Sequence, residues 1–267
     1  MQVLPEAPEN TDRIWMCEIA AICHAALGDD KQAESAAVAV LRQKGERSRP
    51  LEALGTLAVR HGRTMEAEEL FRRAASAEPG RGEPLLAMGM LCWSRGELQE
   101  AFRLLYRSVE LSPLNPDAAG LLHEAARRLG RIPDFLELMQ AILGQFPDTR
   151  HILLELVDAF SENGNISQAL HLLERGIVLI GCDDDLLDLA LSLRRQLGPH
   201  NGSQFMGLPT VSLCMIVRDE SACLPRCLAS ARPVVDEIIV VDTGSIDRTA
   251  DDAEVFGAKV CHYRWEN

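Results

Sequence analysis

Several residues able to hydrogen-bond a ligand follow a short β-branched run near the end of the chain. The run Ile238–Val241 is followed at once by small and acidic residues: Asp242, Thr243, Gly244, Ser245 and Asp247. A carboxylate accepts a hydrogen bond from a base imide N–H or a ribose hydroxyl, and short hydroxyl side chains let a ligand approach the backbone. These residues are candidate ligand contacts. A plain turn that caps the next helix is the alternative interpretation.

A parallel sheet would position these residues. The β-branched run is typical of a strand buried on both faces. We expect the elements in this order: strand 211–217, helix 221–231, strand 237–241, helix 247–256 and strand 258–263. Right-handed crossovers then give a parallel sheet, and ligands bind outside the carboxyl ends of such strands. Arg218, Asp219 and Glu220 follow the first strand at that same edge.

Composition and missing motifs exclude several other functions. No G-x-G-x-x-G follows the first strand, and no G-x-x-x-x-G-K-[ST] occurs, which disfavours a dinucleotide cofactor or a P-loop. The net charge of −13, without a basic patch, disfavours binding to nucleic acid or anionic lipid. The eight cysteines form no C-x-x-C pair and the seven histidines are scattered, so neither indicates a site.

The termini and apolar runs carry no targeting signal. The first residues lack a basic stretch followed by an apolar one, and no apolar run approaches the roughly 18 residues of a membrane span. We therefore expect a cytoplasmic location.

Most of the chain before the predicted sheet repeats with a period of 34 residues. Glycines recur at this spacing, at positions 28, 62, 96, 130 and 164. Five residues after each glycine stand Ala33, Ala67, Ala101, Phe135 and Ala169, and a proline or glycine stands seventeen after it. The pattern predicts two helices per unit, with a glycine turn between them and a small residue that allows close approach.

This pattern resembles the tetratricopeptide repeat, with a Leu-Gly or Met-Gly pair before the turn and Ala-x3-Phe or Ala-x3-Leu after it. The resemblance implies five units over about residues 14–181. The first and fourth units are less regular, because Ala21 and His123 replace the small glycine and Phe135 replaces the alanine.

A further amphipathic segment, Asp183–Leu197, is expected to cap the array, because a solenoid needs an element that covers its last apolar face. Its acidic start favours helix capping and solvated charge over a cation site. The predicted domains are a repeat domain at 14–197, a Gly- and Pro-rich linker at 198–209 and an α/β domain at 210–267.

The first helices of the repeats would line a concave groove. By repeat position, the residues that would face it are Trp15, Arg49, Arg60, Trp93, Arg127 and Arg128. Arginines bind carboxylates and tryptophans anchor apolar groups, so we hypothesise that the groove binds an extended peptide or an acidic tail. Partly solvated surface and packing between repeats is the alternative.

The last segment resembles the start of a family 2 glycosyltransferase of the GT-A fold. The resemblance rests on SLCMIVRDE at the first strand, LPRCL in the helix, VVDEIIVVDTGSIDRT around the second strand, and FGAKV followed by Tyr263 and Trp265. The expected fold is therefore an all-α tetratricopeptide solenoid followed by a truncated α/β unit, Rossmann-like with βαβαβ order.

The resemblance also implies roles for single residues. Asp242 would help to hold the base or ribose of a nucleotide sugar. The residues that would border the same nucleotide are Arg218, Asp219, Glu220, Thr243, Ser245 and Asp247. The chain departs from the family pattern at Asp219, where Asn is common, and at Ile246, where Thr is common.

By this resemblance the reaction would be sugar transfer from a nucleoside diphosphate sugar, expected to be UDP-linked, to a peptide, protein or glycan. The resemblance implies Mg²⁺ or Mn²⁺ for the full-length enzyme. The family's metal-binding Asp-x-Asp motif and catalytic base come later than this segment, so we expect them beyond Asn267, the last residue of the sequence. We therefore expect a truncated chain that has no catalytic residue, binds no metal and is inactive alone. The alternative is a non-enzymatic repeat adaptor for protein–protein interaction.

Overall fold

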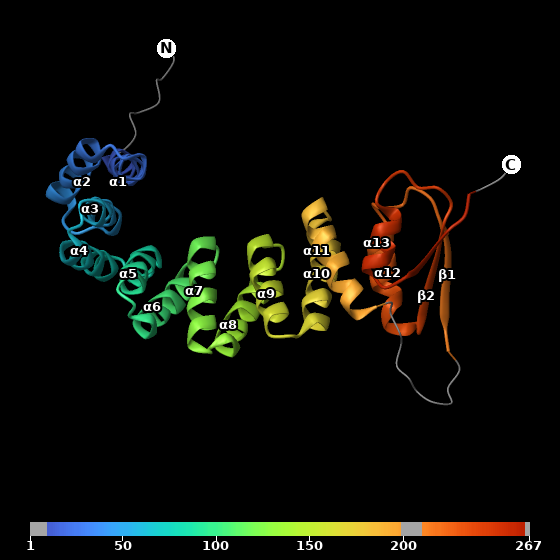
Figure 1. Cartoon of the computed structure of the whole chain (residues 1–267). Coiled ribbons are helices and arrows are strands. Elements are labelled where there is room, and N and C mark those ends of the chain that lie inside the picture. Colours follow the sequence, from blue (N-terminus) through green and yellow to red (C-terminus); the bar gives the residue numbers. More distant parts are fainter. Residues whose placement is uncertain (1–9, 199–209, 265–267) are drawn as a thin grey trace, which may run out of the picture. The chain divides into compact units, whose positions relative to one another are not determined.

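The computed structural model describes residues 10–198 and 210–264, with side chains from Ile14 onward. The first part is helical (Figure 1): α1 (Asn10–Leu27), α2 (Asp30–Lys44), α3 (Ser48–Arg60), α4 (Thr64–Ala77), α5 (Glu83–Ser94), α6 (Leu98–Leu111), α7 (Pro116–Leu129), α8 (Ile132–Gln145), α9 (Arg150–Glu162), α10 (Ile166–Ile180) and α11 (Asp184–Leu197). The second part alternates: β1 (Ser212–Val217), α12 (Leu224–Ala231), a 3₁₀ turn (Arg232–Val234), β2 (Glu237–Asp242), α13 (Thr249–Val255) and β3 (Lys259–His262). This order confirms the predicted fold class.

Three of the sequence predictions fall on positions outside the described residues. These are the predicted linker beyond Gly198, the family-matching Trp265, and Asn267, beyond which we expect the catalytic residues. The structure does not test them, and they stay predictions.

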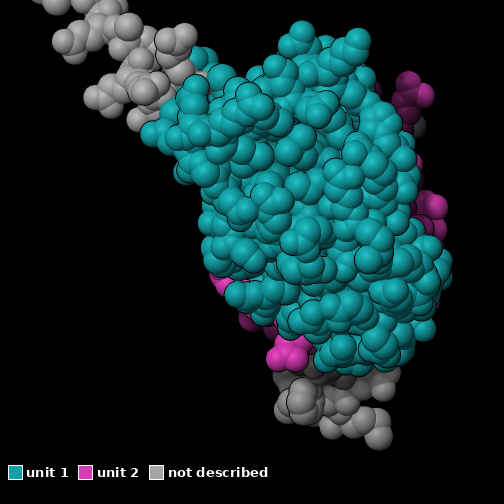
Figure 2. Space-filling view, turned by 90° about the vertical axis from the view of Figure 1, so that its left-hand side faces the viewer, with its two compact units in different colours: residues 1–135 teal, residues 136–267 magenta. Residues whose placement is uncertain are grey.

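The chain divides into two compact units, residues 1–135 and 136–267, coloured separately in Figure 2. The division falls inside α8 and not at the predicted linker. Each repeat of a solenoid contacts only its neighbours, so contacts along the array are local and a division can fall at any point along it. In the second unit α12 packs on α10 and α13 packs on α11, which joins the sheet to the last repeat helices.

The periodic residues have the roles that the spacing predicts. Gly62 and Gly96 adopt φ values of 70° and 78°, which residues other than glycine rarely do, and each allows the chain to turn into the next helix. Gly55 lies so close to Phe71 that an added Cβ would be 2.5 Å from the ring. The two helices of this repeat therefore approach more closely than a larger residue would permit.

In the irregular fourth repeat, two residues that contact each other are replaced together. His123 and Phe135 stand where the two preceding repeats have glycine and alanine, and their rings stack with centroids 4.7 Å apart and planes 10° from parallel. Phe135 is completely buried. In this repeat, two aromatic rings that pack on each other thus replace the two small residues found at the same positions in the preceding repeats.

The sheet has the strand order β1-β2-β3 and is parallel throughout. Figure 1 shows α12 and α13 on one side of β1 and β2. Ile238 and Val240 are buried on that side, whereas Ile216, on the opposite face, is 69% exposed. The expectation of strands buried on both faces is therefore wrong for the described residues. Both right-handed crossovers run in the same direction, which places both helices on the same face.

A buried ion cluster joins the sheet segment to the repeat helices within the second unit. Glu174 on α10 accepts a hydrogen bond from Arg194 on α11 (2.6 Å) and another from Arg232, just after α12. Arg194 also donates to the carbonyl of Val255, the last residue of α13 (2.9 Å). Glu174 and Arg194 are 3% and 5% exposed, so these charges are compensated by each other and not by water.

Glu174→Ala is expected to lower the free energy of unfolding of the second unit by about 3–5 kcal/mol, because it leaves two arginines facing a buried site without their carboxylate. Urea unfolding and amide hydrogen exchange of α10–α13 measure this loss. Glu137→Ala, a change of an exposed glutamate on α8, is the control. Equal urea midpoints for the two variants would contradict the role of the cluster.

Two glycine substitutions should have opposite effects. Gly55→Ala should destabilise the protein by about 1–3 kcal/mol, because the new methyl group overlaps the Phe71 ring. Gly144→Ala, near the end of α8, meets nothing within 4 Å and should stabilise by about 0.5 kcal/mol through helix propensity. Thermal unfolding of both variants checks the signs; the same sign for both would count against the close packing of α3 and α4.

Candidate functional site

The carboxyl ends of the three strands form a row at one edge of the sheet. Val217 at the end of β1 pairs with Asp242 at the end of β2, and Asp242 pairs with His262 at the end of β3. The loop after β1 and the turn after β2 therefore meet there, as the sequence predicts. This edge is the candidate site.

Asp242 is a buried carboxylate held by its own turn. It is 4% exposed, and its Oδ1 accepts hydrogen bonds from the backbone N–H and the hydroxyl of Ser245. Its Oδ2 lies 3.2 Å from Nδ1 of His262. A carboxylate has about four lone-pair positions, so these contacts fix its orientation and leave it able to accept a further hydrogen bond.

The environment keeps Asp242 ionised. Burial raises the pKa of its carboxyl, but the hydrogen bonds from Ser245, His262 and the Gly244 backbone outweigh burial, and the net pKa lies below its usual value. Asp242 is therefore a preorganised hydrogen-bond acceptor and not a proton donor at neutral pH.

The loop after β1 is fastened to the turn after β2 through Asp219. Its backbone N–H donates to the hydroxyl of Ser245 (2.9 Å), and its Oδ1 accepts from the N–H of Ile246 (2.8 Å). Asp219 has φ 54°, in the left-handed region that is uncommon for residues other than glycine. The neighbouring Arg218 is 63% exposed and lies 3.7 Å from the Asp219 carboxylate.

Glu220 and Asp247 make a second connection between the same loops. The N–H of Glu220 donates to the hydroxyl of Thr249 (2.7 Å), and Oδ2 of Asp247 accepts from the N–H of Ser221 (3.2 Å). The hydrogen bond from the Thr249 side chain is the main cause that lowers the pKa of Asp247. The helix α13 begins at Thr249 and not at Asp247. The carboxylate of Asp247 instead accepts hydrogen bonds from the N–H groups of Thr249 and Ser221.

Thr243 differs from the other predicted residues. Its N–H and its hydroxyl both lie 3.0 Å from the carbonyl of Val217, to which they donate. The hydroxyl therefore joins the turn to the end of β1. The structure brings the seven predicted residues into two cross-linked loops, with Asp242 at their centre.

Sequence reasoning missed four residues at this edge. Ser221 and Thr249 link the loops, and Asp252, 1% exposed with a pKa raised by burial, accepts from the Ser221 hydroxyl. His262 contacts Asp242, so the interpretation that no histidine indicates a site is wrong for His262. The usable signal was its place at the predicted end of the third strand.

The divalent cation that the resemblance implies has no set of ligands here. Within the part of the chain that the structure describes, no three His, Cys, Asp or Glu side chains gather in a way that could hold a metal ion. The described residues therefore do not fit that ion.

Two of the predicted groove arginines are bound within the repeats. The guanidinium of Arg60 pairs with Asp30 and donates to the carbonyl of Ala25. Arg49 lies 3.5 Å from the buried carboxylate of Glu18. These contacts connect neighbouring repeats, so both side chains already have partners within the repeat domain.

The other predicted groove residues make contacts of a different kind or are exposed. Arg128 stacks over the ring of Trp93, 4.5 Å from its centroid, which is a cation–π contact between α5 and α7. Arg127 and Arg128 both donate to Glu124, each at 2.7 Å from Nε. Trp15 on α1 is 56% exposed. The structure thus brings Trp93 and Arg128 together, and Arg127 shares Glu124 with Arg128.

Comparison with known families agrees with both parts of the fold. A family model described as tetratricopeptide repeat matches residues 52–116, and one described as glycosyl transferase family 2 matches residues 212–267. The chain combines tetratricopeptide repeats with a segment of a family 2 glycosyltransferase domain. The candidate site lies entirely within the glycosyltransferase segment.

Curated relatives match over short stretches. A TPR repeat-containing protein of Synechococcus elongatus is 59% identical over 63 residues, which is 23% of this chain and 16% of the relative. An uncharacterized glycosyltransferase of Rickettsia felis is 42% identical over 55 residues, which is 21% of this chain and 19% of the relative. The matches therefore span between about a sixth and a fifth of these relatives.

Solved structures resemble the helical fold. Pseudomonas aeruginosa PilF has a TM-score of 0.52 at 15% identity, over 70% of this chain and 85% of that one. Naa15/Naa10 bound to HypK-THB has a TM-score of 0.52 at 16% identity, over 68% of this chain and 28% of that one. At these identities the likeness shows the fold alone. No helix among the described residues is long and apolar enough to cross a bilayer.

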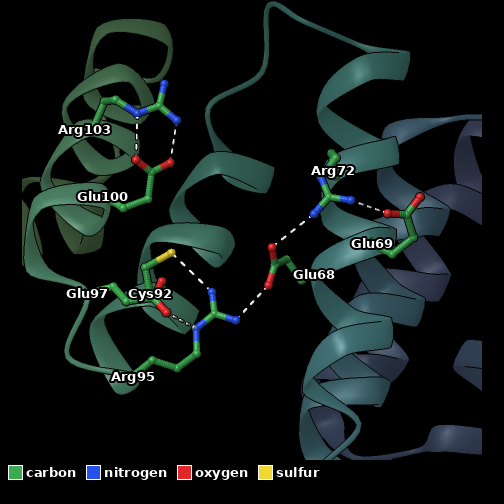
Figure 3. Close-up of polar contacts among 8 residues, drawn as sticks. All are labelled: Glu68, Glu69, Arg72, Cys92, Arg95, Glu97, Glu100 and Arg103. Carbon is green, nitrogen blue, oxygen red and sulfur yellow. Dashed lines mark hydrogen bonds and ion pairs between the residues drawn. The ribbon is translucent and has the colours of Figure 1, made fainter.

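A second polar cluster, in the tetratricopeptide repeats, is structural (Figure 3). Glu68 on α4 accepts from Arg72 (3.0 Å) and from Arg95 (2.7 Å), which follows α5. Arg95 also lies 3.5 Å from the sulfur of Cys92 and 3.2 Å from Glu97. Burial, the larger effect, raises the pKa of the Cys92 thiol. The cluster links two repeats and does not activate a nucleophile.

The lowered pKa of Asp242 predicts an acid dependence of stability. The carboxylate is more stable in the folded than in the unfolded protein, so its contribution is present above the ordinary aspartate pKa of about 4 and is lost as the pH falls through the lower folded value. The difference in urea midpoint between wild type and Asp242→Asn should be constant near neutral pH and shrink in acid. A carboxyl titration by NMR that places Asp242 at or above the ordinary value would refute this.

Proposed function

We propose that the glycosyltransferase segment binds a nucleoside diphosphate sugar at the ends of β1–β3, in an enzyme that transfers the sugar to an acceptor. The observation that supports this most is Asp242, an ionised and oriented carboxylate at the carboxyl ends of parallel strands, where ligands of open α/β sheets bind. The match of residues 212–267 to the family 2 glycosyltransferases supports the same assignment.

In this proposal the described residues bind and orient the nucleoside diphosphate sugar. Asp242 accepts a hydrogen bond from the base or the ribose, and Ser245 holds the carboxylate in place. Asp219 and Glu220 keep the loop after β1 against the turn, so that the nucleotide meets a preformed edge. The acceptor nucleophile would attack the anomeric carbon while the bond to the diphosphate breaks.

Asp242 is a binding residue in this scheme and not the base, because the lowered pKa of its carboxyl makes it a weak proton acceptor. No Asp-x-Asp motif occurs among residues 212–267. We therefore expect this chain alone to bind nucleotide without sugar transfer, and sugar transfer by the chain alone would refute this part of the proposal.

For the tetratricopeptide repeats we propose a peptide or protein partner, which could be the acceptor. On α5, Met90 is 51% exposed and lies one turn before Trp93. Arg128 covers the Trp93 ring, and Arg127, its neighbour in sequence, pairs with the same Glu124 as Arg128. This combination suits a peptide that carries an apolar side chain next to an acidic one. Arg49 and Arg60 are less suited, because Glu18 and Asp30 hold them across two repeats, whereas the carboxylate that pairs with Arg127 and Arg128 belongs to their own helix.

A second function is a non-enzymatic adaptor, in which the repeats bind a partner and the sheet segment binds no nucleotide. One observation favours it: both oxygens of Asp242 already have partners within the fold, as in a plain turn between strand and helix. Nucleotide binding distinguishes the two functions.

The first test is calorimetry of the chain with UDP, with and without Mn²⁺. Asp242→Ala should weaken UDP binding about 10- to 100-fold, since it removes a charged hydrogen-bond acceptor. Asp251→Ala, which removes an exposed carboxylate of α13, should leave affinity unchanged and is the control. If UDP and the other nucleoside diphosphates give no binding to wild type, the adaptor function is favoured instead.

The repeat proposal is tested with a peptide array. The double change Arg127→Glu and Arg128→Glu should abolish binding of peptides with an acidic residue next to an apolar one. The matched control is Arg103→Glu with Arg107→Glu, because both of these arginines also pair with glutamates of their own helix. Unchanged binding in the first variant, or equal loss in both, would contradict the assignment of the partner surface to α5 and α7.

A further inference from the structure

His262 lies beside Asp242 but has no part in the function proposed above. Its side chain is 72% exposed, whereas the carboxylate that it contacts is almost fully buried. The N–H of the next residue, Tyr263, donates to the carbonyl of Asp242 (2.8 Å), which fixes the backbone immediately after the histidine. The ring is therefore held at its base and along one edge, and its other edge faces outward.

The contact with Asp242 determines which ring nitrogen carries the proton. A carboxylate only accepts hydrogen bonds, so Nδ1 of His262 must be the donor across the 3.2 Å contact. In the neutral ring Nε2 then has no proton and is an acceptor. The pair therefore has two acceptors, the remaining lone pairs of Asp242 and, on the far edge of the ring, Nε2 of His262.

A ligand that lies against two acceptors must bring donors. A base imide N–H and the ribose hydroxyls are donors, whereas the diphosphate of a nucleotide carries acceptor oxygens and negative charge. The nucleoside end of the ligand is therefore complementary to this pair, and the diphosphate is not.

The surroundings of His262 leave room for such a ligand. His262 also forms part of the wall of a cleft of about 460 Å³, between the end of α11 and the edge formed by α13 and β3. The charged residues of that wall are Arg194, Arg195, Glu254 and Lys259. Of the three cations in this wall, Arg194 is paired with Glu174 and Arg195 lies 3.5 Å from Glu254.

We infer that His262 is a nucleoside-contacting residue of the strand-end site, which accepts a hydrogen bond through Nε2 from the base or ribose that Asp242 also binds. This inference rests on the proposed nucleotide binding. It adds a residue that helps to select the nucleoside and makes Asp242 and His262 one recognition pair.

The test is an NMR titration of the chain with uridine and with UDP. His262→Ala should weaken binding of both ligands by the same factor, about three- to ten-fold, because the lost contact is a neutral hydrogen bond to the part that they share. Cys261→Ala is the control, since Cys261 is the exposed neighbour on the opposite face of β3. Equal affinity of wild type and His262→Ala would overturn the inference, and so would a loss confined to UDP.

A second measurement does not depend on how the variant folds. In wild type, imidazole ¹⁵N shifts should show the proton of His262 on Nδ1, and uridine should shift Nε2. A proton on Nε2, or an Nε2 signal that uridine leaves unchanged, would overturn the inference. If Asp242→Ala abolishes binding but His262→Ala does not, the inference alone fails. If wild type binds no nucleoside or nucleoside diphosphate, the proposed function fails with it.

Discussion

The second unit depends on one buried carboxylate. Glu174 compensates Arg194 and Arg232, which come from the capping helix and from the turn after α12. Arg194 in turn holds the end of α13 through the carbonyl of Val255. A three-stranded sheet with helices on one face buries little apolar surface, so it gains stability by packing on α10 and α11. The ion cluster fixes the place at which it packs.

The candidate site depends on that attachment through α13. Thr249 and Asp252 on this helix hold Glu220 and Ser221 of the loop after β1, and the same loop bonds to Ser245 through Asp219. Ser245 then orients Asp242. The hydroxyl and carboxylate groups thus have two roles in one network, since the bonds that close the turns also aim the acceptor toward the edge of the sheet.

The repeats show how a periodic sequence tolerates exceptions. Close approach of two helices requires that the side chains at their crossing fill one fixed volume. A glycine opposite Phe71 and a histidine stacked on Phe135 both meet that requirement, the first with one ring and the second with two. Arginines at equivalent groove positions also differ in their contacts, because Arg60 pairs with Asp30 in the preceding repeat whereas Arg128 stacks on Trp93.

The sequence by itself determined the two parts of the fold and most of the candidate site. The glycines at a 34-residue spacing and the strand run before Asp242 act over a few residues, within one turn or one strand, so they can be recognised without knowledge of distant contacts. Only the tertiary structure decided that the sheet is covered on one face, that Thr243 turns to Val217 and that His262 meets Asp242. Each of these depends on strand register and crossover direction between residues about 20 or more positions apart, which no local pattern encodes.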